Sequence, residues 1–379
     1  MFWKYTLFQM KVFFRKRKQW ILGILILLIF PLFYLYYQNS EPTNTSKQKI
    51  EEKDLLLMTL DLLPGEVRST EEGMKIYENL TQQLSIINMQ IYYLKTEQGR
   101  EEDNYIADGL TLNQLRMELH EQGNPFIPEY FVIDREEIQK ENDLLMYLDQ
   151  HDLEIEDNPY VATQFLVSAF KLIVGPILFM IILLLGSDMV AFERNHQTML
   201  KMLPISFMKK AMSKIGIQFT YILSLILLSL LAGGSYVITK EGMGNLKYPV
   251  IMYTSTGYEI IPISKYILYV LLALILIIFM VLFLALLIES FIKNEYGTVL
   301  IGIALFFIPE VFHLFDVNMK ILFPLKYIDI TSVLSGDLAE KYGLSSIDYW
   351  HSILSMIGFT IVILIGLFIK NKLSFKKHN

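Results

Sequence analysis

Cysteine is absent from the 379-residue sequence, and this absence excludes several classes of chemistry at once. A chain without cysteine has no thiol nucleophile, no thiolate metal site and no disulfide bond. Any domain of this chain that folds outside the cytoplasm must therefore be stabilised by packing alone. Such a composition suits a protein of the bacterial envelope that does not depend on a disulfide framework.

The sequence motifs of common catalytic sites are also missing. There is no G-x-x-x-x-G-K-[S/T] loop, so the chain does not itself bind and hydrolyse ATP through such a loop. H-E-x-x-H and G-x-S-x-G are absent too. The six histidines lack the spacing of metal ligands, and paired carboxylates such as Glu101-Glu102 do not face one another on a helix. We therefore expect no catalytic residue, no metal site and no cofactor bound by this chain.

Charged residues make up only 19% of the chain and are unevenly distributed. Residues 38–160 contain 27 acidic and 10 basic side chains, whereas the remainder contains 12 acidic and 23 basic ones. A nucleic-acid binder carries positive charge on a folded domain, and the sizeable polar part of this chain is acidic. The pattern therefore argues against a nucleic-acid partner and indicates an acidic insert within a basic membrane protein.

Long apolar runs are the dominant feature of what is present. Hydrophobic residues make up 53% of the chain, and residues 266–288 contain no charged side chain. A transmembrane helix needs about 20 such residues. The apolar run at residues 296–315 is interrupted in its second half by Pro309, Glu310 and His313. The sequence thus predicts an all-α membrane protein with six transmembrane helices, near residues 20–37, 165–190, 216–238, 266–288, 296–315 and 349–369.

The distribution of Lys and Arg predicts the orientation of these helices. With the N-terminus inside, the short cytoplasmic pieces carry 16 basic residues and the two short outer connections carry six. Cytoplasmic loops retain positive charge, so we expect both termini in the cytoplasm. Asp188 and Glu289 then lie near cytoplasmic helix ends, where we expect water nearby. The resulting domains are 1–19, 20–37, 38–160 and 161–379, the last with a cytoplasmic loop at 191–215.

The first two of these segments are interpreted as a surface helix and a membrane anchor. Residues 1–19 combine aromatic and basic side chains, which favours a helix lying along the inner leaflet over an unstructured basic tail. Residues 20–37 end in a Phe- and Tyr-rich stretch instead of the small residues of a cleavage site. We therefore expect the first span to be retained in the membrane.

Residues 38–160 are predicted to form a helical extracytoplasmic domain between the first two spans. Apolar residues from Ile76 to Leu94 recur at three- and four-residue steps and share one helix face. Three capping residues, each followed three positions later by an acid or an amide, predict helix starts: Ser69 with Glu72, Thr111 with Gln114, and Asp134 with Glu137.

The loop between the second and third spans has the pattern of a short helix that projects from the membrane. Residues 193–203 can form this helix, and Pro204 ends or kinks it. Basic residues at 209–214 then return the chain to the membrane surface. The alternative interpretation is a generic amphipathic loop lying on lipid.

This loop resembles that of type-two ABC exporter permeases. In that family an acid precedes a Gly-Thr pair, and a Leu-x-x-x-Pro-x-Ser stretch leads into the next span. The matching residues are Glu193, Thr198, Leu200, Pro204 and Ser206. Asn195 and Gln197 depart from the pattern, since the family commonly has an acid and a glycine there. Six spans, an N-terminal interfacial helix, an insert after the first span, and the Phe323–Tyr327 and Val333–Gly336 stretches extend the resemblance over nearly the whole chain.

The resemblance implies a permease subunit that is not itself an enzyme. In that family the 193–204 region is a coupling helix that docks on a separate ABC ATPase subunit, which binds ATP and Mg. Two permease units, the same chain or a paralogue, form the translocation pathway in the bilayer. The implied function is ATP-driven export across a bacterial cell membrane. The implied ATPase contacts are Glu193, Arg194, Thr198, Leu200, Lys201, Leu203 and Pro204.

Glu310 and His313 are candidate pathway residues, because ionisable groups at membrane depth are costly and suggest function. They lie one helical turn apart and could form a polar lining of the route. The alternative is that the fifth helix ends at Pro309 and Glu310 already lies in the outer interface.

Other classes of protein fit less well. A membrane receptor or immunity protein that binds a peptide through its outer domain should carry a substantial cytoplasmic output domain, and the cytoplasmic pieces here are short. A mechanotransmission permease has four spans. An intramembrane enzyme lacks any supporting motif.

Overall fold

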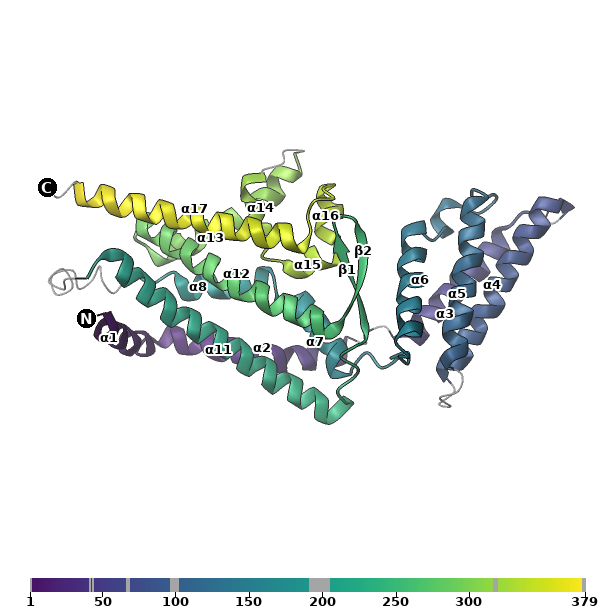
Figure 1. Ribbon diagram of the computed structural model, residues 1–379, viewed down its shortest axis with the longest axis horizontal. Helices are drawn as coiled ribbons and strands as arrows, with labels where there is room; N and C mark the ends of the chain where they lie inside the picture. The colour runs from purple at the N-terminus through teal and green to yellow at the C-terminus, as the bar shows by residue number, and fades with distance from the viewer. Residues whose placement is uncertain are drawn as a thin grey trace.

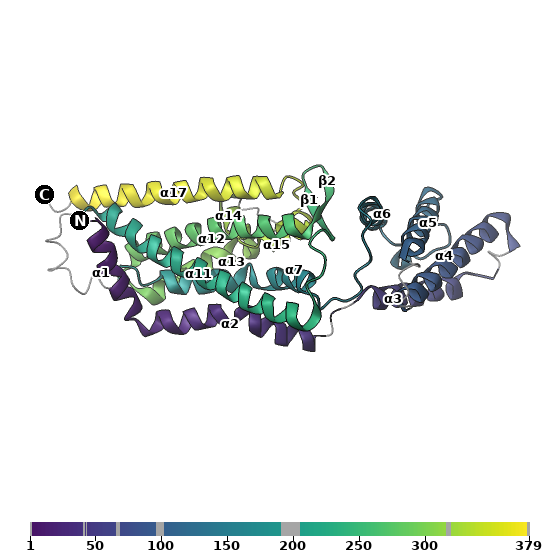
Figure 2. The same cartoon turned by 60° about the horizontal axis from the view of Figure 1, so that its bottom comes forward.

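The protein has two parts that follow one another along its long axis, a bundle of long helices and a smaller helical domain (Figures 1 and 2). The computed structural model describes residues 2–40, 42, 44–65, 69–95, 102–190, 205–315 and 320–376. Both chain termini lie at one end of the bundle, here termed the terminal end. The opposite end carries a β-hairpin and is termed the hairpin end. The smaller domain lies beyond the hairpin and is termed the insert domain.

Among the residues that the structure describes, five helices of the bundle are long and apolar enough to cross a membrane. A membrane offers no water to backbone polar groups, and a helix satisfies these groups internally. About 67% of the apolar window of α12 is buried inside the protein, against 22–33% for the other four, so α12 is the central helix. The five are α2 (Arg17–Asn39), α11 (Phe207–Glu241), α12 (Ile263–Ile292), α13 (Glu295–His313) and α17 (Tyr349–Lys376).

The second predicted span is broken in the structure. It consists of α7 (Ala162–Ile173) and α8 (Pro176–Gly186), which are bent by 60° relative to one another. Gly175 at the bend has φ +145° and ψ −132°, a backbone conformation that residues other than glycine rarely adopt. Pro176 then starts α8 with its fixed φ. The expectation of one continuous span is wrong here, and the described chain has six spans only if this pair counts as one.

A β-hairpin at the end of the bundle adds two short strands to a fold that is otherwise helical, as predicted. Strands β1 (Pro249–Thr254) and β2 (Gly257–Pro262) pair antiparallel, with Tyr253 opposite Tyr258. Met252 of β1 is buried in the core of the bundle, and Val250 and Tyr253 pack against that core. β1 contacts both the bundle and the insert domain, so the hairpin connects the two parts. Short helices follow α13 in the chain, and α15 among them contacts β1. They are η3 (Lys320–Leu322), α14 (Phe323–Lys326), α15 (Ile330–Ser335) and α16 (Asp337–Tyr342).

The insert domain is helical, as the sequence predicts. Its elements are α3 (Thr45–Leu62), α4 (Glu71–Lys95), α5 (Glu102–Glu121), η2 (Glu129–Phe131) and α6 (Arg135–Gln150). The predicted apolar face of α4 is confirmed, since Ile76, Leu80 and Ile87 are buried. The helix start expected at Thr111 is wrong. Thr111 lies within α5, and its hydroxyl donates to the carbonyl of Ala107 at 3.0 Å.

The N-terminal helix α1 (Phe2–Phe14) packs against α11 at the terminal end. Tyr5, Gln9 and Phe13 form its buried face, while Trp3 and Leu7 on other faces are exposed. A helix is therefore present where the sequence predicts one, and its position along a membrane surface remains a prediction.

Candidate functional site

The predicted coupling helix lies outside the described residues. Glu193, Arg194, Thr198, Leu200, Lys201, Leu203 and Pro204 all fall in the range 191–204, which the structure does not describe. Their contact with an ATPase therefore remains a prediction. The chain on both sides of this range is described, and its first flank is held by an unusual set of polar contacts.

Side chains from the start of α2 hold the residues that follow α8. The Lys16 Nζ donates to Oδ2 of Asp188 at 2.7 Å and to the Asp188 carbonyl at 3.1 Å. The Gln19 Nε2 donates to Oδ1 of the same carboxylate at 3.3 Å. The Lys18 Nζ donates to the Ser187 hydroxyl at 2.9 Å. Asp188 is thus bound through both carboxylate oxygens and its main chain.

Side chains from α11 bind the backbone of the same segment. The Lys214 Nζ donates to the Met189 carbonyl at 2.7 Å, and the Gln218 Nε2 donates to the Leu185 carbonyl at 2.9 Å. Lys214 and Gln218 lie one helical turn apart, so a single face of α11 reaches both carbonyls. Both side chains are buried.

Central helix α12 contributes a carboxylate to the last described residue of the flank. Both oxygens of Glu289 accept from the Val190 N–H, at 3.0 and 2.9 Å. Glu289 is 1% exposed and Asp188 is 5% exposed, so the expectation that water lies near these two carboxylates is wrong. A buried polar group is stable only when it is paired or hydrogen-bonded, and both are, since Asp188 pairs with Lys16 and Glu289 accepts from Val190.

The set of contacts is termed the flank cluster. Its members lie at the terminal end of the bundle, and each makes a hydrogen bond to a residue of the segment 185–190. They are Lys16, Lys18, Gln19, Lys214, Gln218 and Glu289. Three different helices, including the central one, therefore hold the chain where it enters the undescribed range. Movement of this flank requires these helices to move or the buried contacts to break.

Sequence reasoning missed the flank cluster because its partners are far apart in the chain. Lys16 and Asp188 are separated by 172 residues. The available signal was the coincidence of opposite charges at helix ends that share one side of the membrane. That signal does not specify which cation meets which carboxylate.

Glu310 and His313 lie at the hairpin end of α13. The helix continues through Pro309 to His313, so the alternative that it ends at Pro309 is wrong. Glu310 pairs with Lys326 at 2.9 Å and also with Lys341. His313 Nε2 lies 3.1 Å from the Lys341 carbonyl. Both residues thus connect α13 to α14 and α16, and their role in a transport route remains a prediction.

Metal-binding geometry is not found in the described part of the chain. Across residues 2–40, 44–65, 69–95, 102–190, 205–315 and 320–376, no three side chains of His, Asp or Glu gather where they could hold an ion. The chemistry that the flank cluster can supply is hydrogen bonding and ion pairing, which position a segment without transforming a substrate.

Comparison with known proteins gives one result at the level of family. The family model described as ABC-2 family transporter protein matches residues 9–378, nearly the whole chain. No curated protein and no solved structure matches it.

Proposed function

Since the chain belongs to the ABC-2 family of transporter proteins, we propose that it is the membrane subunit of an ATP-driven exporter. The family membership itself makes it a multi-pass membrane permease of an ABC transporter. In this proposal it works as a dimer and is coupled to a separate ATPase through residues 193–204. It lies in a bacterial cell membrane with both termini in the cytoplasm.

The flank cluster is the observation that carries the coupling part of this proposal. A segment that receives mechanical work must be attached firmly to the helices that it moves. Residues 185–190 are held by α11, α12 and the start of α2 through buried and partly buried hydrogen bonds. A loosely attached loop would absorb a displacement of the ATPase without passing it on.

The second flank supports the same proposal. The chain resumes at Ile205 and enters α11, which runs for 35 residues from Phe207. At 1.5 Å per residue this helix is about 50 Å long, so it crosses the whole bundle. α11 contacts α1, α2 and α12. A push on residues 193–204 therefore acts on one end of a long rigid helix.

The mechanism follows from these attachments. ATP binding draws two ATPase subunits together, and the two coupling segments move with them as rigid bodies. Each segment shifts its α8 and α11, and the dimer exchanges an inward-facing packing for an outward-facing one. ATP shifts this equilibrium only because it binds the two states with different affinity. The permease alone therefore does not pump.

The test is co-purification of an ABC ATPase with the full chain, followed by reconstitution in proteoliposomes. Glu193→Ala and Leu200→Asp are expected to lose the ATPase, while the matched Lys11→Ala on the exposed face of α1 keeps it. Retention of the ATPase by both loop variants would contradict the coupling proposal.

Orientation is checked in a separate experiment, because this chain contains no cysteine of its own. The variants Thr198→Cys and Glu78→Cys are expected to react with a membrane-impermeant thiol reagent from opposite sides of the membrane.

A further inference from the structure

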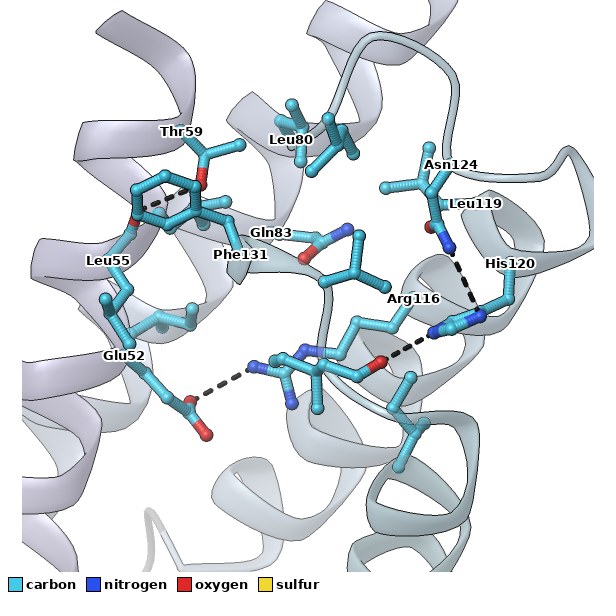
Figure 3. Close-up of a pocket in the computed structure, with 16 residues that line it drawn as sticks. Glu52, Leu55, Thr59, Leu80, Gln83, Arg116, Leu119, His120, Asn124 and Phe131 are labelled. Atoms are coloured by element: carbon cyan, nitrogen blue, oxygen red, sulfur yellow. Dashed lines mark hydrogen bonds and ion pairs between the residues drawn. The ribbon is translucent and has the colours of Figure 1, made fainter. Parts of the chain in front are cut away.

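The insert domain contains a cavity that the export proposal does not use. Its volume is about 80 Å³, and it lies between α3, α4, α5 and the segment 124–133. Figure 3 shows Leu55, Thr59 and Phe131 on one side of it and Leu119, His120 and Asn124 on the other. The lining is mostly aliphatic and aromatic. Its volume is roughly half that of an engineered apolar cavity of about 150 Å³ that accepts benzene, so a branched aliphatic side chain fits.

The wall formed by segment 124–133 is fixed in place by a histidine. The His120 Nε2–H donates to the Ile133 carbonyl at 2.6 Å, and its Nδ1 accepts from the Asn124 side chain at 3.2 Å (Figure 3). Both ring nitrogens are therefore engaged by the segment that covers α5. These two hydrogen bonds hold the segment 124–133 against α5, so the wall of the cavity has a defined position.

A buried ionic group forms the polar part of the wall. Arg116 is 5% exposed and pairs with Glu52 at 3.1 Å and Glu141 at 2.9 Å. Lys49 pairs with the same two carboxylates at 3.0 and 2.7 Å. Two cations and two carboxylates leave this group neutral. A neutral group of this kind fixes the positions of α3, α5 and α6 around the cavity without placing a net charge beside it.

An exposed apolar stripe on α3 continues outward from the cavity. Leu55 lines the cavity and is 48% exposed, and Met58 and Leu62 follow at helical spacing with exposures of 55% and 57%. On the bundle, lipid accounts for such exposure. The insert domain lies beyond the hairpin, away from the bundle (Figure 1). A bilayer therefore does not cover this stripe.

The charge of the surrounding domain indicates what does cover it. Residues 38–160 carry 27 acidic and 10 basic side chains, so the field around the cavity attracts cations. The stripe favours an amphipathic helix, and the cavity favours one branched aliphatic side chain from that helix.

We propose that the insert domain binds a cationic amphipathic peptide, which lies along α3 and inserts one aliphatic side chain into the cavity beside Arg116. This binding is independent of the export proposal, because it requires neither an ATPase nor the segment 193–204.

The experiment uses the full chain in phosphatidylcholine nanodiscs, without ATPase. The probe is a 14-residue helical peptide of Lys and Leu with a central photoreactive leucine and a fluorophore, and binding to empty nanodiscs is subtracted. Leu55→Asn is expected to weaken binding at least tenfold. Leu57→Asn, on the same helix but not lining the cavity, is expected to change it less than twofold. A peptide with Glu in place of Lys is expected not to bind.

Photocrosslinking gives the second measurement. Cross-links are expected on residues that line the cavity, such as Leu55, Ile127 and Phe131. Equal loss of binding in the Leu55 and Leu57 variants, equal binding of the acidic peptide, or cross-links confined to the bundle would each overturn the proposal. Because Leu55 is half-exposed, its replacement does not empty the core of the domain.

Discussion

The flank cluster and the ionic group of the insert domain are built differently, although both combine lysine or arginine with carboxylates. In the insert domain, Lys49, Arg116, Glu52 and Glu141 pair side chain to side chain and neutralise one another. In the flank cluster, several side chains bind backbone atoms of the one short segment 185–190. The first arrangement holds three helices together, whereas the second holds a piece of chain in a defined position. We therefore expect disruption of the first to cost stability and disruption of the second to cost coupling.

The largest effect is expected from Arg116→Met. This change leaves Glu52 and Glu141 close together with only Lys49 as a partner, and a buried pair broken in this way costs about 3–5 kcal/mol. Hydrogen exchange should show loss of protection across α3, α5 and α6. The exposed Arg135→Met is the matched control and should leave protection unchanged. If protection at residues 185–190 fell as well, the two groups would not be independent.

Asp188→Asn is expected to have a smaller effect on stability and a larger one on coupling. The amide keeps one oxygen for Lys16 but loses the charge, at a cost of about 1–3 kcal/mol. In proteoliposomes with the partner ATPase, ATPase binding should persist while its stimulation by the permease falls about tenfold. The exposed Asp337→Asn is the control. Unchanged stimulation in Asp188→Asn would show that the flank cluster is only structural.

Acidification should destabilise the ionic group of the insert domain. Burial alone would raise the pKa of Glu141, but Lys49 and Arg116 outweigh it and lower that pKa below its usual value. The stabilisation is therefore complete above the unfolded glutamate pKa of about 4.3 and is lost as the pH falls from there through the folded-state pKa. Limited proteolysis of the insert domain across this range should show the loss. Glu141→Gln should be less stable at neutral pH and should lack this part of the pH dependence.

The smallest effect is expected from Lys140→Met, which tests the joint between the insert domain and the hairpin. The Lys140 Nζ lies 3.6 Å from the centroid of the Tyr258 ring and 2.9 Å from Glu136. These contacts are partly exposed, and together they contribute about 0.5–1 kcal/mol. Unfolding of the insert domain should shift only slightly, and the flank cluster should not respond. A loss of several kcal/mol would show that the domain depends on the hairpin.

Features that depend on local periodicity were predictable from the sequence. The apolar spacing that begins at Ile76 gave the buried face of α4, and the capping pattern at Asp134 and Glu137 gave the start of α6. The loop motif gave the family, which the match over residues 9–378 confirms. The capping pattern at Thr111 failed because a threonine hydroxyl can bond within a helix as well as at its start.

Features that depend on distant contacts or on single backbone angles were not predictable. Gly175 permits the bend between α7 and α8, but glycine also occurs in straight helices, so the sequence did not require the bend. The hairpin strands are six residues each, too short to stand out beside long apolar runs. Glu289 meets Val190 across 99 residues of sequence, and no local pattern encodes that contact. The roles of Glu310, His313 and the 193–204 residues stay predictions.

The central position of α12 has a consequence for how this protein can change over generations. Only 22% of the apolar window of its neighbours α13 and α17 is buried inside the protein, so few of their side chains are confined by packing within this chain. About 67% of the apolar window of α12 is buried inside the protein, so most of its side chains there occupy volumes that other residues define. Sequence drift should therefore accumulate on α13 and α17, while substitutions at the buried positions of α12 survive only in compensating pairs.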